Sequence, residues 1–97
     1  MFTYPVKLEK DKATGMYVAS CRDLPLMNSV GDSIQCTLQE SIHGLVTAVS
    51  IEIDEGRTIP SGSKIKNGEY AIPLPEWVAT KASLHNAMIE SGLQNTE

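Results

Sequence analysis

The longest regular pattern of apolar residues in this chain lies between Ser33 and Gly56. Apolar residues recur there in steps of three and four, which places them on one face of an α-helix. They are Ile34, Leu38, Ile42, Leu45, Val46, Val49 and Ile53. Asp32 or Ser33 can cap the start of this helix, with Gln35 returning the hydrogen bond if Asp32 is the cap. Gly56 suits the position just past its end, so the sequence predicts one long amphipathic helix.

Four shorter segments alternate between apolar and polar residues, which is the period of a half-buried β-strand. They cover residues 2–9, 16–21, 26–30 and 69–74. A charged turn at residues 10–15, which contains a glycine, predicts that the first two pair as an antiparallel hairpin. Pro5 and Pro73 lack an amide proton, so each indicates an edge strand, or for Pro5 a position early in its strand.

A second helix is predicted from Pro75, which suits the first turn of a helix, to Gly92. Its apolar residues are Trp77, Val78, Leu84, Met88 and Ile89. We expect Trp77 to anchor this helix on the sheet rather than to form a platform for a ligand. The resulting order, β-β-β-α-β-α, predicts an α+β fold with a small, mainly antiparallel sheet on which the long helix packs.

The length of 97 residues fits one domain of modest stability, and we expect it to form a homo-oligomer. No apolar run reaches the length of a membrane span and the N-terminus is not a signal peptide, so the expected location is the cytoplasm. Cys21 and Cys36 are expected to be reduced there and to be buried structural thiols. Together with His43 and His85 they lack the spacing of a zinc site, so we expect no metal and no other cofactor.

Charge is distributed unevenly along the chain. No lysine or arginine lies between Arg22 and Arg57, whereas six carboxylates do, namely Asp23, Asp32, Glu40, Glu52, Asp54 and Glu55. This stretch therefore accounts for the net charge of −4. An acidic stretch repels nucleic acid and attracts basic protein surfaces. A solvated helix face with acidic ends is the alternative interpretation, and the charge pattern alone leaves both open.

Several short motifs follow one another in an order and spacing that resemble the HicB family of antitoxins. They are Tyr4-Pro5-Val6, Gly15 with Tyr17-Val18-Ala19-Ser20, Asp23-Leu24-Pro25, and Gly31-Asp32-Ser33 at the start of the long helix. The later motifs resemble the longer members of that family, and they are Ile72-Pro73-Leu74-Pro75, Ala79-Thr80-Lys81 and Leu84-His85-Asn86-Ala87. The resemblance covers nearly the whole chain. It departs at Leu26-Met27-Asn28, where many relatives have a glycine, so the shape of that loop stays open.

The resemblance implies a partial RNase H-like fold and a protein partner, the HicA toxin, which is a small basic RNase of double-stranded-RNA-binding-domain fold. It also implies that longer relatives repress their own operon through a C-terminal DNA-binding domain, of helix-turn-helix or ribbon-helix-helix type. Residues 1–92 would then form the antitoxin domain. Residues 93–97 look like the start of such a missing domain, so we expect a truncated antitoxin that binds its toxin but not operator DNA. A basic toxin is a partner that the acidic stretch would attract.

Two functions of different classes are therefore considered. An antitoxin would meet its toxin through polar residues at one end of the stretch without positive charge, namely Asp23, Asn28, Asp32 and Glu40. A metal-dependent RNase H-like nuclease remnant would instead need several carboxylates that converge on two metal ions. The candidates for that role are Glu9, Asp23 and Glu40, which are scattered along the chain. We therefore assign no catalytic residue and expect a binding protein rather than an enzyme.

Overall fold

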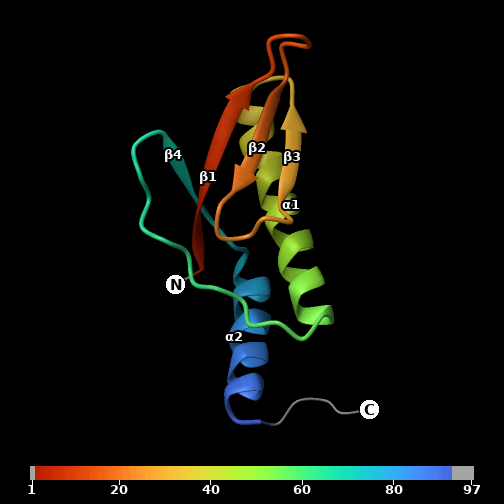
Figure 1. Ribbon diagram of the computed structural model, residues 1–97, viewed down its shortest axis with the longest axis vertical. Coiled ribbons are helices and arrows are strands. Elements are labelled where there is room, and N and C mark those ends of the chain that lie inside the picture. Colours follow the sequence, from red (N-terminus) through yellow and green to blue (C-terminus); the bar gives the residue numbers. More distant parts are fainter. Residues whose placement is uncertain (1, 93–97) are drawn as a thin grey trace.

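The computed structural model describes residues 2–92, which form a four-stranded sheet and two helices (Figure 1). The elements are β1 (Thr3–Lys10), β2 (Tyr17–Cys21), β3 (Asn28–Gly31), α1 (Ile34–Asp54), β4 (Glu69–Pro73) and α2 (Glu76–Glu90). The strands lie in the order β3-β2-β1-β4, and every neighbouring pair is antiparallel. The predicted α+β class and the predicted order of elements are confirmed.

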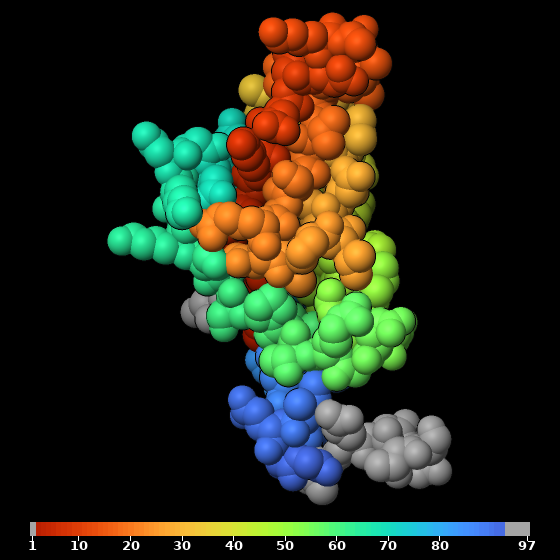
Figure 2. Space-filling model, in the orientation of Figure 1, coloured from red at the N-terminus to blue at the C-terminus, as the bar shows by residue number. Residues whose placement is uncertain are grey.

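The register of the strands divides the side chains of the sheet between two faces. Val6 of β1 lies opposite Cys21 of β2 and Tyr70 of β4, and these side chains point to the same face because paired residues do so. Buried residues of β1 and β2 on that face form the core with α1, and they are Tyr4, Val6, Ala19 and Cys21. The opposite face, which we call the open face, carries exposed residues such as Lys7 and faces the reader in Figures 1 and 2.

The place of β1 in the sheet corrects one prediction. β1 lies between β2 and β4, so the prediction that Pro5 marks an edge strand is wrong. The alternative prediction, a position early in the strand, is confirmed. Proline is accommodated there because the pairing of β1 with β2 begins only at Val6. The chain near residue 60 runs past this part of β1, where the Tyr4 hydroxyl donates a hydrogen bond to the Pro60 carbonyl at 2.6 Å. Pro73 lies on β4, which is an edge strand as predicted.

Both ends of α1 follow from capping residues. The Ser33 side chain accepts a hydrogen bond from the Cys36 amide at 3.1 Å, so Ser33 and not Asp32 is the N-cap. At the other end Gly56 adopts a φ of +75°, a left-handed conformation that glycine reaches without steric cost.

The face of α1 that packs on the sheet differs in part from the predicted apolar row. Leu45 and Val49 are buried as expected, but Ile34 is 43% exposed, and Thr37 and Ser41 are fully buried. Burial of these two hydroxyls is tolerated because each donates to a carbonyl one turn earlier, at 2.6 Å for Thr37 and 2.7 Å for Ser41. The buried face is therefore rotated away from the larger apolar residues and towards two small polar ones.

The packing of α2 overturns the expectation for Trp77. Val78 and Ala82 are the buried residues of this helix, whereas Trp77 is 67% exposed. Adjacent residues of an α-helix differ by about 100° around its axis, so the helix that buries Val78 turns Trp77 outward. In Figures 1 and 2, α2 extends below the sheet and leaves much of its surface uncovered. Neither helix of the described residues has the length and apolar character needed to cross a membrane.

A long connection without helix or strand, residues 55–68, joins α1 to β4 and is fixed by side chains from elsewhere. Ile59 is buried, and its amide and carbonyl groups bind the Asn86 side chain of α2 at 2.8 and 2.9 Å. The His85 ring nitrogen Nε2 lies 2.8 Å from the Arg57 carbonyl oxygen. These contacts hold α2 and the connection together, although few large side chains of α2 are buried.

Candidate functional site

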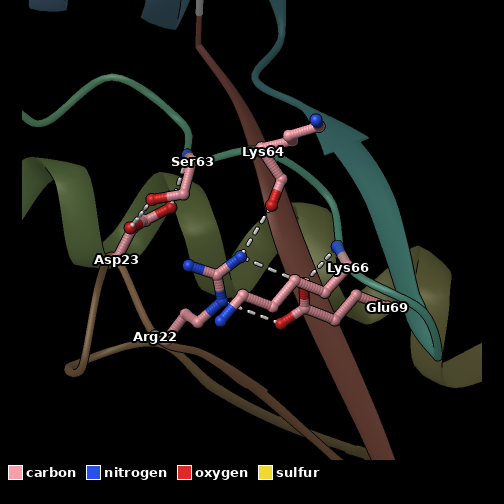
Figure 3. A network of polar contacts seen from close by, with 6 residues as sticks. All are labelled: Arg22, Asp23, Ser63, Lys64, Lys66 and Glu69. Atoms are coloured by element: carbon pink, nitrogen blue, oxygen red, sulfur yellow. Dashed lines mark hydrogen bonds and ion pairs between the residues drawn. The ribbon is translucent and has the colours of Figure 1, made fainter.

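The carboxylate of Asp23, which follows β2 closely, is used within the chain. It accepts hydrogen bonds from the amide and the hydroxyl of Ser63, at 2.8 and 2.5 Å (Figure 3). Asp23 thus fastens the connection 55–68 to the end of β2. Of the four residues predicted to face a toxin, Asp23 is the one whose carboxylate already holds a folded segment in place.

The neighbouring residue Arg22 fastens the same connection to β4. Its guanidinium donates to the Glu69 carboxylate at 2.9 and 3.1 Å and to the Lys64 carbonyl at 2.7 Å (Figure 3). The hydrogen bond from Arg22, followed by one from the Lys66 amide, lowers the pKa of Glu69 from 4.5 to about 2. Because the folded-state pKa is depressed, this pair stabilises the fold above pH 4.5 and loses its effect as the pH falls towards 2.

The acidic residues of the stretch between Arg22 and Arg57 do not form one surface. Asp32 is exposed just before α1 and Glu40 is exposed on its second turn, whereas Glu52 and Asp54 lie near its end. Along the helix axis, Glu52 is about 30 Å from Asp32 and about 18 Å from Glu40. Arg57 forms an ion pair with Glu52 and lies 4.0 Å from Glu55, which offsets negative charge at that end. Asp32 and Glu40 are therefore the exposed carboxylates of this stretch that lie furthest along the sequence from any arginine or lysine.

A shallow groove lies between the outer side of β3 and one row of α1. It brings together two of the predicted residues, Asn28 and Glu40. Its other lining residues are Leu26, Ser29, His43, Gly44 and Thr47. The walls are held close because the Ser29 hydroxyl donates to the Glu40 carbonyl at 3.0 Å. We call this feature the β3–α1 groove, and it is the candidate site of the domain.

Sequence reasoning missed most of the groove lining, and two signals pointed to it. Leu26 belongs to the segment Leu26-Met27-Asn28, where the sequence was expected to depart from the family pattern, and it is 50% exposed and lines the groove. Gly44 interrupts the middle of a long helix, where glycine is unfavourable. A Cβ at Gly44 would overlap the Ser29 hydroxyl and displace it from the Glu40 carbonyl, so glycine preserves this contact between α1 and β3.

Comparison with known protein families places this geometry in context. Residues 3–83 match a family described as the HicB-like antitoxin of bacterial toxin-antitoxin systems. The chain belongs to this antitoxin family. The match spans β1 through the first half of α2, so the whole sheet and the β3–α1 groove lie within the part shared with the family.

Relatives with curated names agree with this membership. The chain is 32% identical to antitoxin HicB of Pseudomonas fluorescens over 98 residues, which cover 100% of this chain and 66% of the relative. It is 33% identical to antitoxin HicB 2 of Photorhabdus laumondii over 94 residues, which cover 97% of this chain and 65% of the relative. The chain thus spans about two thirds of the length of these antitoxins.

Solved structures show the same fold at low sequence identity. The N-terminal domain of Burkholderia pseudomallei antitoxin HicB superposes with a TM-score of 0.59 at 18% identity, covering 76% of this chain and 96% of that one. The longer structure of that antitoxin gives a TM-score of 0.56 at 18% identity and covers 99% of this chain and 90% of that one. The arrangement of sheet and helices is therefore that of a HicB antitoxin.

The three carboxylates considered for a nuclease are held apart in this antitoxin fold. Glu9 is exposed on the open face, 3.5 Å from Lys7, while Glu40 lies on α1 and Asp23 binds Ser63. In the part of the chain that the structure describes, no three residues of the His, Cys, Asp and Glu types are placed to hold a metal ion. The geometry therefore offers no support for the nuclease alternative.

The two cysteines differ in their surroundings. Cys21 is 3% exposed in the core, as predicted, and burial raises the pKa of its thiol, which keeps it in the unreactive protonated form. Cys36 in the first turn of α1 is only partly buried, so the prediction of a buried thiol is confirmed for Cys21 alone.

If Asp23 holds the connection 55–68, then Asp23→Ala should destabilise the fold by about 1–3 kcal/mol, because the Ser63 amide loses its acceptor. The matched control is Asp54→Ala, which removes an exposed carboxylate at the end of α1. It should change the free energy of unfolding by less than about 0.5 kcal/mol. Urea titration of both variants measures the difference. Equal stabilities of the two variants would show that Asp23 has no structural role.

Proposed function

We propose that this chain binds and neutralises a small, basic toxin of the HicA type in the cytoplasm. Membership of the HicB-like antitoxin family supports this proposal. The observation that carries it is a pair of exposed carboxylates at this end of the domain, with Glu40 in the lining of the β3–α1 groove and Asp32 in the turn that follows β3. A basic RNA-binding protein presents positive charge on its surface, which such carboxylates attract.

The toxin-facing surface would consist of Asn28, Asp32 and Glu40. Asn28 and Glu40 both line the groove, and Asp32 lies in the turn between β3 and α1. Glu40 has one weak partner, His43, whose Nδ1 atom is 3.7 Å away. Its carboxylate therefore remains available to a cation from a partner. Asp23 would contribute indirectly, because it fixes the connection that follows α1.

Charge reversal tests this assignment. Asp32→Lys combined with Glu40→Lys should slow association with an inactivated HicA-type toxin by about tenfold at low salt and should flatten the dependence of the rate on salt. Stopped-flow or surface-based kinetics at several salt concentrations measure both effects.

The matched control places the same two charges at the other end of α1, as Asp54→Lys with Glu55→Lys. This control changes the net charge equally but leaves the groove intact, so it should retain most of the association rate. Equal slowing by both double variants would mean that net charge, and not this surface, guides the toxin. Absence of any complex with the unaltered chain would contradict the proposed function itself.

Autoregulation of the operon would depend on residues outside these 97. The chain carries a net charge of −4, whereas affinity for DNA comes largely from basic residues that meet phosphates. The chain also spans about two thirds of the length of its relatives, which leaves room in those proteins for a further domain.

In an electrophoretic mobility assay at moderate salt, these 97 residues should therefore give no specific shift of operator DNA. The same sample should still bind the toxin, which confirms that the protein in the assay is folded. Specific binding at nanomolar protein concentration would contradict this part of the proposal.

Self-association would use the exposed side of α2. Trp77, Leu84 and Met88 are 67%, 60% and 42% exposed, and their spacing of seven and four places them in one row along the helix. Lys81 lies in the same row, so the four residues are separated by intervals of four, three and four. This spacing is the same in both directions along the helix. Two copies packed antiparallel about a twofold axis would place Trp77 of each against Met88 of the other.

Trp77→Ser and Leu84→Ser should each weaken self-association by about tenfold or more. Tryptophan is a frequent anchor of protein interfaces, and a leucine side chain that becomes buried adds hydrophobic stabilisation. Sedimentation equilibrium over a range of concentrations measures the effect. Leu26→Ser is the control, because Leu26 is 50% exposed but lies beside β3. A monomer at all concentrations, or loss of association with Leu26→Ser alone, would contradict a role for α2.

A further inference from the structure

The two edges of the sheet are protected very differently. β4 carries Pro73, which cannot donate to a further strand, and Glu69, whose charge is held in place by Arg22. β3 has the sequence Asn28-Ser29-Val30-Gly31, with neither proline nor charge. Within residues 2–92 no strand pairs with its outer side (Figure 1). Backbone amide and carbonyl groups along β3 are therefore open to another strand.

The surroundings of β3 have the shape that an added strand needs. Neighbouring strands lie about 4.8 Å apart, so an added strand would run along the β3–α1 groove. On one side its residues would meet the row of α1 that contains Glu40, His43 and Thr47. On the other side they would lie beside Val30, which is 50% exposed on the open face.

The chemistry of the groove selects the kind of strand. Glu40 lines it, Asp32 stands at the end of β3, and no arginine or lysine contributes to its lining. Residues of a strand alternate between faces. The segment that fits therefore places basic residues towards Glu40 and apolar residues towards Val30, at every second position.

We propose that β3 receives an extended basic segment of the toxin as a fifth strand of the sheet. The proposal rests on the proposed function and specifies how the same site binds: main-chain hydrogen bonds to β3 supply affinity and alternating side chains supply specificity. A second copy of this chain paired through β3, and a toxin that contacts only side chains, are the competing arrangements.

Hydrogen exchange of backbone amides distinguishes these arrangements. Alternate amides of an edge strand point outward and exchange quickly, so those of residues 28–31 should include both fast and slow exchangers in the free chain. In the complex with an inactivated basic toxin, the fast amides should slow by about tenfold or more as they gain carbonyl acceptors. NMR detection resolves each amide of β3 separately.

A pair of variants tests the same site by affinity. Val30→Lys and Ala71→Lys each add a positive charge to an exposed residue of the open face, on β3 and on β4 respectively. Val30→Lys should weaken toxin binding by about tenfold or more, since lysine on an edge strand opposes pairing and repels a basic segment. Ala71→Lys should leave the affinity nearly unchanged. Circular dichroism and thermal unfolding of both variants confirm that the fold is intact.

Each other outcome overturns the proposal in a recognisable way. A complex that forms without slower exchange in β3 would retain the antitoxin function but exclude strand addition. Protection of β3 that appears in the free chain and rises with its concentration would show pairing between copies instead. Equal weakening by the two lysine variants would show a general effect of charge on the open face. If no complex forms at all, the proposed function fails and not merely this mode of binding.

Discussion

The close approach of α1 to β3 is the contact on which the arrangement of this domain depends. Two glycines make it possible, because a Cβ at Gly31 would overlap Thr37 and a Cβ at Gly44 would overlap Ser29. The helix packs against β3 more extensively than against any other strand. The helix therefore packs under the β3 edge of the sheet rather than under its middle. Residues of α1 next to this contact, such as Glu40 and His43, reach the outer side of β3. The β3–α1 groove is a direct consequence of this offset.

The same contact explains why the orientation of α1 could not be predicted from apolar residues alone. Periodicity identified the helix and the burial of Leu45 and Val49, because those residues lie on the packed face in either orientation. Thr37 and Ser41 lie outside the row of apolar residues, and their hydroxyl groups would be costly to bury without partners. Their bonds to the preceding turn remove that cost. The small volume of both side chains then decides which face fits against β3.

The strands were easier to predict than the position of α2 for a related reason. Alternation with a period of two gives a strand a single apolar face, and the burial of Tyr4 and Val6 in β1 follows directly from it. The apolar residues of α2 occupy two sides of the helix, so the pattern did not tell Trp77 from Val78. Hydrogen bonds decide the matter, because Asn86 binds Ile59 and turns the side with Val78 inward. The family motif that contains His85 and Asn86 thus has a structural role that its sequence alone did not reveal.

Closeness in sequence was a poor guide to the acidic site. Six carboxylates lie in one stretch of sequence, yet they are spread from the end of β2 to the end of the 21-residue helix α1, and Arg57 pairs with Glu52 and lies near Glu55 at its far end. The fold instead combines a few carboxylates with an open strand edge. That combination matters physically, because charge on its own attracts any basic surface, whereas main-chain pairing accepts only an extended segment in one register.

The difference between the two edges of the sheet determines how the proposed interactions can be combined. Within residues 2–92, Pro73 and Glu69 disfavour strand addition at β4, whereas β3 has no such protection. Each domain would then take up one toxin segment. The row of α2 proposed for self-association shares no residue with the β3–α1 groove. Occupation of one surface therefore leaves the side chains of the other free. A self-associated antitoxin would bind one toxin per copy, and its neutralising capacity would not depend on its own oligomeric state.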